Sequence, residues 1–369
     1  ITTYTVEASS SSQFGGGALV FSVSTVSSAG PAATFTTLLA NTTYHLRALA
    51  LNHPGVPTVL AGLGSISTLA QPPASAVSTF PVVYAASMTV IWETGGNPLS
   101  VTTYTVVLST GEGYPNGYSG NVSLSTAPAG APPSASPAGL LANTTYFLFV
   151  EAVNNVGVGS GYAVLGSTVT LALEPASAAS TFPVVGNASL SARWESGGNG
   201  PGTLYEAWLS TETPLSTTHA GNVTVSTRPE GAPEAVLAGL LSNTTYFLFV
   251  RAVGHSGLPT PYIALGSTAT LANTPLAEAA PFSDVSTGSL AGYWNANGNG
   301  AGTRYETVVG TAFPYTAGDT GNIRITTAPE GAPAGAVPDR LANASYYRYA
   351  AAVNRAGVPT PYGALGYPQ

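Results

Sequence analysis

The side chains able to act as general bases, metal ligands or nucleophiles are few in this chain and lie far apart. Its four histidines are His45, His53, His219 and His255, and none has a carboxylate next to it in the sequence. A catalytic base or a metal site needs at least two such groups that converge. Cysteine is absent, so thiol chemistry and disulfides are excluded. We therefore predict that the chain is not an enzyme and that it holds no cofactor or metal.

The acidic residues do not suggest a catalytic pair or a calcium site either. Aspartate occurs only at Asp284, Asp319 and Asp339, whereas calcium joints of the cadherin type need several carboxylates at every domain boundary. Glu93 and Glu195 each follow a tryptophan, but no second acid recurs with them. A hydrolase of the paired-carboxylate type requires two acids that face one cleft.

Asparagine offers one modification chemistry, because Asn-x-Ser/Thr is the acceptor of N-linked glycans in secreted proteins. The alternative is that these sequons arise by chance in a chain rich in Asn, Ser and Thr, and that some of them belong to a structural turn. Both interpretations stay open at this point. The candidate glycosylation sites are Asn41, Asn121, Asn143, Asn187, Asn222, Asn243 and Asn343.

The elements that carry these residues are copies of one unit. The segment Leu-Leu-Ala-Asn-Thr-Thr-Tyr occurs at 38–44 and 140–146, and variants follow at 240–246 and 341–346. A period close to the length of one domain predicts a tandem array of a single fold. The Gln-Pro, Glu-Pro and Thr-Pro steps near 71, 174 and 274 mark the expected boundaries. We call the resulting segments repeats 1 to 4, and they cover residues 1–71, 72–174, 175–274 and 275–369.

Each repeat has the pattern of an all-β sandwich. Short alternating apolar segments are separated by turns rich in Gly, Pro and Asn, and helical periodicity is absent. In the segment after 145, the period of two puts Tyr146, Leu148 and Val150 on one buried face. We expect the hydroxyl of this tyrosine, and of its counterparts Tyr246 and Tyr346, to bond to upstream backbone. The tryptophans expected in the same cores are Trp92, Trp194 and Trp294.

Taken together, these motifs resemble the fibronectin type III domain. In repeat 2 the residues that carry the resemblance are Leu140, Thr144, Tyr146, Val150, Ala152 and Asn154. In repeat 3 the last of these positions is Gly254. The resemblance implies seven-stranded sandwiches, with strands A, B and E in one sheet and C, C′, F and G in the other. By this alignment repeat 1 lacks strands A and B, and repeat 4 has a truncated strand G. We expect upstream sequence or a neighbouring chain to complete them.

Aromatic residues recur on the sheet face opposite the predicted core. A sheet with one face in water normally shows polar side chains there, although single exposed aromatic residues are common on any surface. Recurrence in three repeats favours the hypothesis that another chain or a neighbouring repeat covers them. The interface candidates are Phe147, Phe149, Trp208, Phe247, Phe249, Tyr347 and Tyr349.

Composition narrows the classes of function. Charged residues make up 7% of the chain against 44% hydrophobic residues, so we expect a folded protein whose surface is polar through Ser, Thr, Asn and Gly. Nucleic-acid binding is not expected, because no basic patch could neutralise phosphates. A membrane span is not expected, because no run of 18 apolar residues occurs. The chain begins at Ile1, so we expect it to be processed or to be part of a longer protein.

Two functions follow from this pattern. The leading hypothesis is an extracellular structural protein, prokaryotic in style, whose partners are copies of itself in a cell-surface layer, sheath or filament. Few charges leave little protection against edge-to-edge pairing of strands. The alternative is a passive spacer or adhesion array in a larger secreted protein, with carbohydrate or other cell-surface components as partners.

Overall fold

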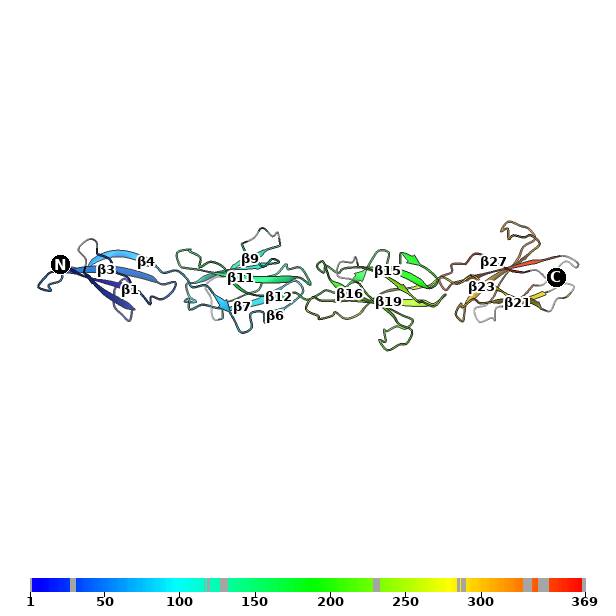
Figure 1. The fold of residues 1–369 in the computed structure, drawn as a ribbon, viewed down its shortest axis with the longest axis horizontal. Helices are drawn as coiled ribbons and strands as arrows, with labels where there is room; N and C mark the ends of the chain where they lie inside the picture. The colour runs from blue at the N-terminus through cyan, green and yellow to red at the C-terminus, as the bar shows by residue number, and fades with distance from the viewer. Residues whose placement is uncertain are drawn as a thin grey trace. The chain divides into compact units, whose positions relative to one another are not determined.

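The computed structural model describes residues 2–26, 31–115, 117, 120–126, 132–227, 233–283, 286, 290–327, 334–337 and 345–366. Every regular element in these ranges is a β-strand, and every paired strand is antiparallel. The chain divides into two compact units, Ile1–Leu171 and Ala172–Gln369, and each unit contains two of the repeats. Figure 1 labels the strands in chain order.

Repeat 2 is a complete two-sheet sandwich. One sheet has the order β12-β11-β8-β9 and corresponds to strands G, F, C and C′. The other has the order β10-β7-β5, with β6 also paired to β7, and corresponds to strands E, B and A. The bounds are β5 Ala74–Ser75, β6 Val82–Val83, β7 Met88–Glu93, β8 Thr103–Ser109, β9 Val122–Thr126, β10 Ser134–Ala135, β11 Thr145–Val153 and β12 Ala163–Val169.

Strand A differs from the expected seven-strand pattern, because it is split into β5 and β6. Pro81 lies between the two pieces. Proline has no backbone N–H to donate, so it interrupts the ladder that a continuous strand would form with β7.

Repeat 3 has the same two sheets, in the orders β17-β16-β19-β20 and β13-β15-β14 with β18 on β15. In repeat 4 the sheets are β24-β23-β26-β27 and β21-β22-β25. The bounds in repeat 3 are β13 Ala176–Ser177, β14 Val184–Val185, β15 Ser189–Glu195, β16 Leu204–Ser210, β17 Val223–Ser226, β18 Glu234–Ala238, β19 Thr245–Val253 and β20 Ile263–Ala269. In repeat 4 they are β21 Leu276–Ser283, β22 Leu290–Asn295, β23 Arg304–Gly310, β24 Ile323–Thr326, β25 Ala334–Val337, β26 Tyr347–Val353 and β27 Gly363–Gly366.

The described residues of repeat 1 form one sheet, in the order β2-β1-β3-β4. The side chains of Tyr4 and Leu46 on this sheet are half-buried, whereas their counterparts Tyr104 and Leu148 are 2% and 0% exposed. One face of the sheet therefore lacks the cover that the second sheet gives in repeat 2. The bounds are β1 Thr3–Ser9, β2 Val20–Val26, β3 Thr43–Leu51 and β4 Ala61–Ser67.

The predicted core is confirmed. Trp92 is buried and meets the ring of Tyr104 edge-on, with 5.3 Å between ring centroids. Trp194 and Trp294 make the same contact with Tyr205 and Tyr305. Full burial of a side chain such as Leu148 stabilises the fold by roughly 1.5–3 kcal/mol, and the alternation along each strand brings several of these into one cluster.

The predicted tyrosine corner is also confirmed in repeats 2 and 3. Tyr146 and Tyr246 are each 2% exposed. The backbone N–H of Leu141 donates to the hydroxyl oxygen of Tyr146 at 2.9 Å, and Leu241 does the same to Tyr246. Each bond closes the turn between strands E and F. Tyr346 is buried as well, but its upstream segment lies outside the described residues.

Candidate functional site

The outer face of the sheet that contains strands C, F and G is the first candidate site. In repeat 2, Phe149 points to this face but is 1% exposed. The ring of Tyr114, from the loop after β8, packs on it with centroids 5.5 Å apart. Tyr162, just before β12, meets Tyr114 edge-on at 4.8 Å. The repeat thus covers its own aromatic residue.

Repeat 3 has a related cluster built around Tyr262. The ring of Tyr262 lies 5.7 Å from that of Trp208, with the guanidinium of Arg251 4.5 Å from its centroid. Its hydroxyl donates to Glu206 Oε2 at 3.0 Å, and Arg251 Nη2 lies 2.6 Å from the same oxygen. Burial, followed by the hydrogen bond to Glu206, raises the pKa of Tyr262 to about 12.

Repeat 4 repeats this arrangement with Tyr362. Its hydroxyl donates to Glu306 Oε2 at 2.8 Å, and its ring lies 4.5 Å from Tyr315. Burial and Glu306 raise the pKa of Tyr362 as well. Tyr315 also packs on Tyr349, whose hydroxyl donates to the carbonyl of Ala312 at 2.9 Å. We call the tyrosine before the last strand of repeats 2 to 4 the tyrosine cap, which is Tyr162, Tyr262 or Tyr362.

The burial of three interface candidates corrects the expectation that a partner covers them. Phe149, Phe249 and Tyr349 are 1%, 5% and 3% exposed within the chain, so they are not available to a partner as the sequence pattern had suggested. The rings that pack on Phe149 and Tyr349 come from loops far away in sequence, and strand alternation carries no information about them. The other interface candidates are half-buried, and their role stays a prediction. They are Phe147, Trp208, Phe247 and Tyr347.

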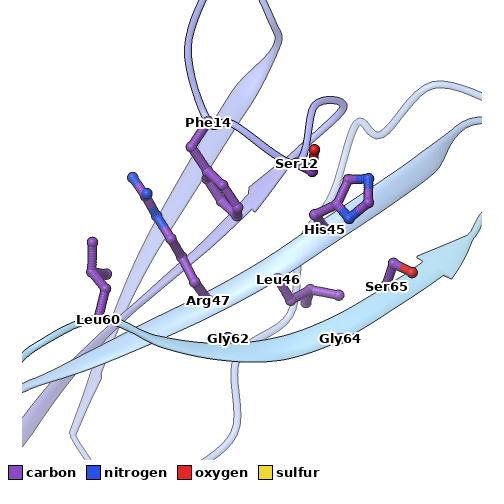
Figure 2. Close-up of a pocket in the computed structure, with 9 residues that line it drawn as sticks. All are labelled: Ser12, Phe14, His45, Leu46, Arg47, Leu60, Gly62, Gly64 and Ser65. Atoms are coloured by element: carbon purple, nitrogen blue, oxygen red, sulfur yellow. The ribbon is translucent and has the colours of Figure 1, made fainter.

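The outer face of repeat 1 is different, because Leu60 stands where the tyrosine cap would be. A pocket of about 460 Å³ is open there (Figure 2). Arg47 lies beside it, with Nε 2.7 Å from Glu7 Oε2 and its guanidinium carbon 3.9 Å from the Phe14 ring centroid. His45, on the same strand, also lines the pocket. His45 and Arg47 occupy the positions that Phe147 and Phe149 hold in repeat 2.

The second candidate site is the junction between consecutive repeats, built on the motif asparagine. Asn41 is 1% exposed, and its Nδ2 donates to Thr102 Oγ1 at 2.8 Å. Its Oδ1 accepts from the backbone N–H of Asn155 at 2.7 Å. Asn41 belongs to repeat 1, and both of its partners belong to repeat 2. The side chain therefore joins the two repeats of this unit.

The other unit contains the same junction. Asn243 Nδ2 donates to Thr303 Oγ1 at 2.7 Å, and Asn243 Oδ1 accepts from Arg355 N–H at 2.8 Å. A second asparagine bonds in the opposite direction, since Asn354 Nδ2 donates to the carbonyl of Thr270 at 3.3 Å. Asn154 makes the corresponding bond to Thr68 in the first unit. We call this set of bonds the asparagine clamp.

The clamp explains two of the four motif sequons. A glycan would be attached at Nδ2, and this atom is already used and buried at Asn41 and Asn243. At these two positions the folded chain has no room for a sugar, so a structural role is the interpretation that holds there. At Asn143, glycosylation stays a prediction. Asn187 is exposed, Asn121 and Asn222 are half-buried, and glycosylation there stays a prediction; Asn343 lies outside the described residues.

The acidic residues and histidines do not converge in the described part of the chain. There, groups of three or more His, Asp or Glu side chains that could hold a metal are absent. His219 pairs with Glu212 at 3.1 Å on the surface of repeat 3, a contact that the sequence distance did not suggest. Within the same described ranges, the chain has no helix capable of crossing a bilayer.

No family model and no curated protein matches the sequence. Among solved structures, the chain is similar to the crystal structure of the FN1-FN3 domains of chicken CNTN1. That match has 16% sequence identity and a TM-score of 0.30, and it covers 80% of this chain and 98% of that one. Repeats 2 to 4 are fibronectin type III-like because their own strand order is that of the E-B-A and G-F-C-C′ sheets, and the sheet of repeat 1 has the G-F-C-C′ order.

Proposed function

We propose that this chain is an extracellular structural array, which builds a surface layer, sheath or filament by packing against copies of itself. The asparagine clamp is the observation that supports this proposal. A tandem array connected only by linkers would bend freely at each boundary. Buried, bidentate bonds at Asn41 and Asn243 instead restrict the angle between neighbouring repeats within a unit. Restricted junctions favour a load-bearing or space-defining role.

Apolar surface on the described residues supports homotypic contacts. Phe313 is 64% exposed and packs on Tyr347 with ring centroids 5.2 Å apart. On β4, Leu63 and Ile66 are 58% and 67% exposed along an edge strand. Charges and prolines normally protect such edges from pairing with other strands. β4 contains neither kind of residue.

Particle shape and mass test the proposal. We expect the full 369-residue chain to form polymers in negative-stain images and to increase in mass with concentration in light scattering. Assembly through apolar faces should change little between low and high salt, because salt screens charge interactions and not apolar contacts. A chain that stays monomeric at high concentration contradicts the proposal.

A matched pair of variants locates the contact. Replacing Phe247 with Ser should weaken assembly and leave the melting temperature almost unchanged, because this side chain is only half-buried. Phe249→Ser should instead unfold repeat 3, since Phe249 is 5% exposed inside it. Assembly that is unaffected by Phe247→Ser would exclude this face as the contact.

The second candidate function is an adhesion module, and the pocket of repeat 1 favours it. Only repeat 1 combines Arg47, His45 and Phe14 around an open pocket on the outer face among the described residues. An adhesion array would appear in the same images as separate particles, with binding activity confined to repeat 1.

A further inference from the structure

The pocket of repeat 1 occupies the place that the tyrosine cap fills in the other repeats. Tyr162, Tyr262 and Tyr362 cover the outer face from the position just before strand G. Leu60 holds that position in repeat 1 and is 40% exposed. Beyond it, a Cβ built on Gly62 or Gly64 would meet no atom within 4 Å. Leu60 in place of the cap, together with His45 and Arg47 in place of the aromatic residues, leaves an open floor of strand backbone, as Figure 2 shows.

The polar side chains around this floor are held in position and have hydrogen-bonding capacity left for a ligand. A guanidinium has five N–H donors, and in Arg47 the Nε is bonded to Glu7. Apart from this bond to Glu7, the guanidinium of Arg47 and the ring of His45 have no hydrogen bond to another residue in the part of the chain that the structure describes. The ion pair with Glu7 and the stacking on Phe14 hold the guanidinium in place before any ligand arrives.

The loop that supplies Phe14 is strained in a way that favours a binding role. Phe14 has φ of +52°, in the left-handed region that bulky residues avoid. Such a conformation is strained for a bulky side chain, and strained residues cluster at sites that include ligand-binding loops. Here the strain places an aromatic ring between Arg47 and His45 over the pocket.

The chemistry of the lining groups selects a class of ligand. The terminal fork of an arginine recognises a planar carboxylate through two parallel hydrogen bonds. Phe14 and Leu60 offer apolar surface for the C–H face of a ring, and the Ser12 and Ser65 hydroxyls with His45 can bond to ring hydroxyls. The volume lies within the range of small-ligand pockets, which combine apolar walls with a few polar groups.

We propose that this pocket binds an acidic saccharide. The carboxylate lies on the terminal nitrogens of Arg47, and the sugar ring lies over the β4 backbone between Phe14 and Leu60. The proposal deepens the second candidate function and gives its ligand class. It does not depend on assembly, because binding can be measured whether the chain is monomeric or polymeric.

The experiment measures binding of three small probes to the full chain by saturation-transfer NMR and calorimetry at low salt. The probes are glucuronate, glucose as its neutral counterpart, and acetate as a carboxylate without a ring. We expect saturable binding of glucuronate, with glucose and acetate at least about tenfold weaker because each lacks one part of the recognition. No saturable binding of glucuronate overturns the proposal. Equal binding of glucose excludes the carboxylate contact, and equal binding of acetate excludes a saccharide ligand.

Three variants test the residues. Arg47→Gln removes the fork, and Leu60→Tyr installs the cap that the other repeats carry; each should weaken glucuronate binding by about tenfold or more. Leu60→Tyr leaves Arg47, Glu7 and Phe14 intact, so its loss of binding cannot be attributed to a broken ion pair. Arg251→Gln is the control, because Arg251 pairs with Glu206 on the same face of repeat 3 beneath Tyr262. Binding that is retained in Leu60→Tyr, or lost equally in Arg251→Gln, overturns the assignment.

Discussion

Arg348 lies in the core of repeat 4 directly over Gly292, in the place where repeats 2 and 3 have a leucine. The side chain is 0% exposed, and its guanidinium carbon is 5.3 Å from the Trp294 ring centroid. The residue on strand B that faces this position is smallest in repeat 4, where Gly292 faces Arg348. The corresponding pairs are Val90 with Leu148 in repeat 2 and Ala192 with Leu248 in repeat 3. Glycine at position 292 leaves the space that the Arg348 side chain occupies, because a Cβ on Gly292 would overlap the arginine.

This complementarity predicts a rescue. Gly292→Ala alone should destabilise repeat 4 by about 1–3 kcal/mol, because an added methyl group overpacks a filled core. Combined with Arg348→Leu, which restores the pair found in repeat 3, the same alanine should be tolerated. Denaturant melts of the two single variants and the double variant measure the coupling. Purely additive effects would show that the two side chains do not share this space.

Loss of the tyrosine-corner hydrogen bond should lower the stability of the repeat that contains it. Tyr246→Phe removes the acceptor for the Leu241 N–H and should lower the free energy of unfolding of repeat 3 by roughly 1–3 kcal/mol. Tyr293→Phe is the control, because Tyr293 is 40% exposed. If both variants melt alike, the hydrogen bond contributes nothing measurable.

The tyrosine cap predicts alkaline sensitivity. The folded-state pKa of Tyr162 and Tyr262 is about 12, above the ordinary value of 10.0, mainly because burial disfavours the phenolate. Between these two values the unfolded chain has lost protons that the folded chain retains, so stability falls as pH rises from about 10 to about 12. Absorbance of tyrosinate during a pH titration should show a late phase. In Tyr262→Phe the phase should shrink; an unchanged profile would exclude Tyr262 as its source.

Strand periodicity predicted the features that depend on the local sequence pattern. The alternation after residue 145 identified the buried face, and the motif at 140–146 identified the hydrogen bond that closes the corner. The tyrosine cap could not be predicted in this way, because Tyr114 and Phe149 meet only through the path of a loop. Hydrophobicity also misleads at Arg348, where the alternation points inward but the charge suggests the surface.

The role of the motif asparagines could not be predicted from their local sequence. In Asn41 and Asn243, an acceptor for a glycan and a residue of a junction have the same local sequence, so no motif search can separate them. A signal was nevertheless available, since these sequons recur in phase with the repeat whereas Asn187 does not. Recurrence in phase favours a structural role, because every boundary between repeats needs the same contact.

The asparagine clamp should stiffen the junction between repeats 3 and 4. Asn243 has φ of +50°, so Asn243→Gly removes the side chain while keeping a residue that tolerates this backbone conformation. The variant should lose the bonds to Thr303 and Arg355. Repeat 4 should then unfold about 1–3 kcal/mol more easily, and the small-angle scattering curve should show greater flexibility. Thr217→Gly serves as the control because Thr217 is exposed in a loop of repeat 3 away from this junction. Equal flexibility in both variants would mean that the junction is held by packing and not by the asparagine.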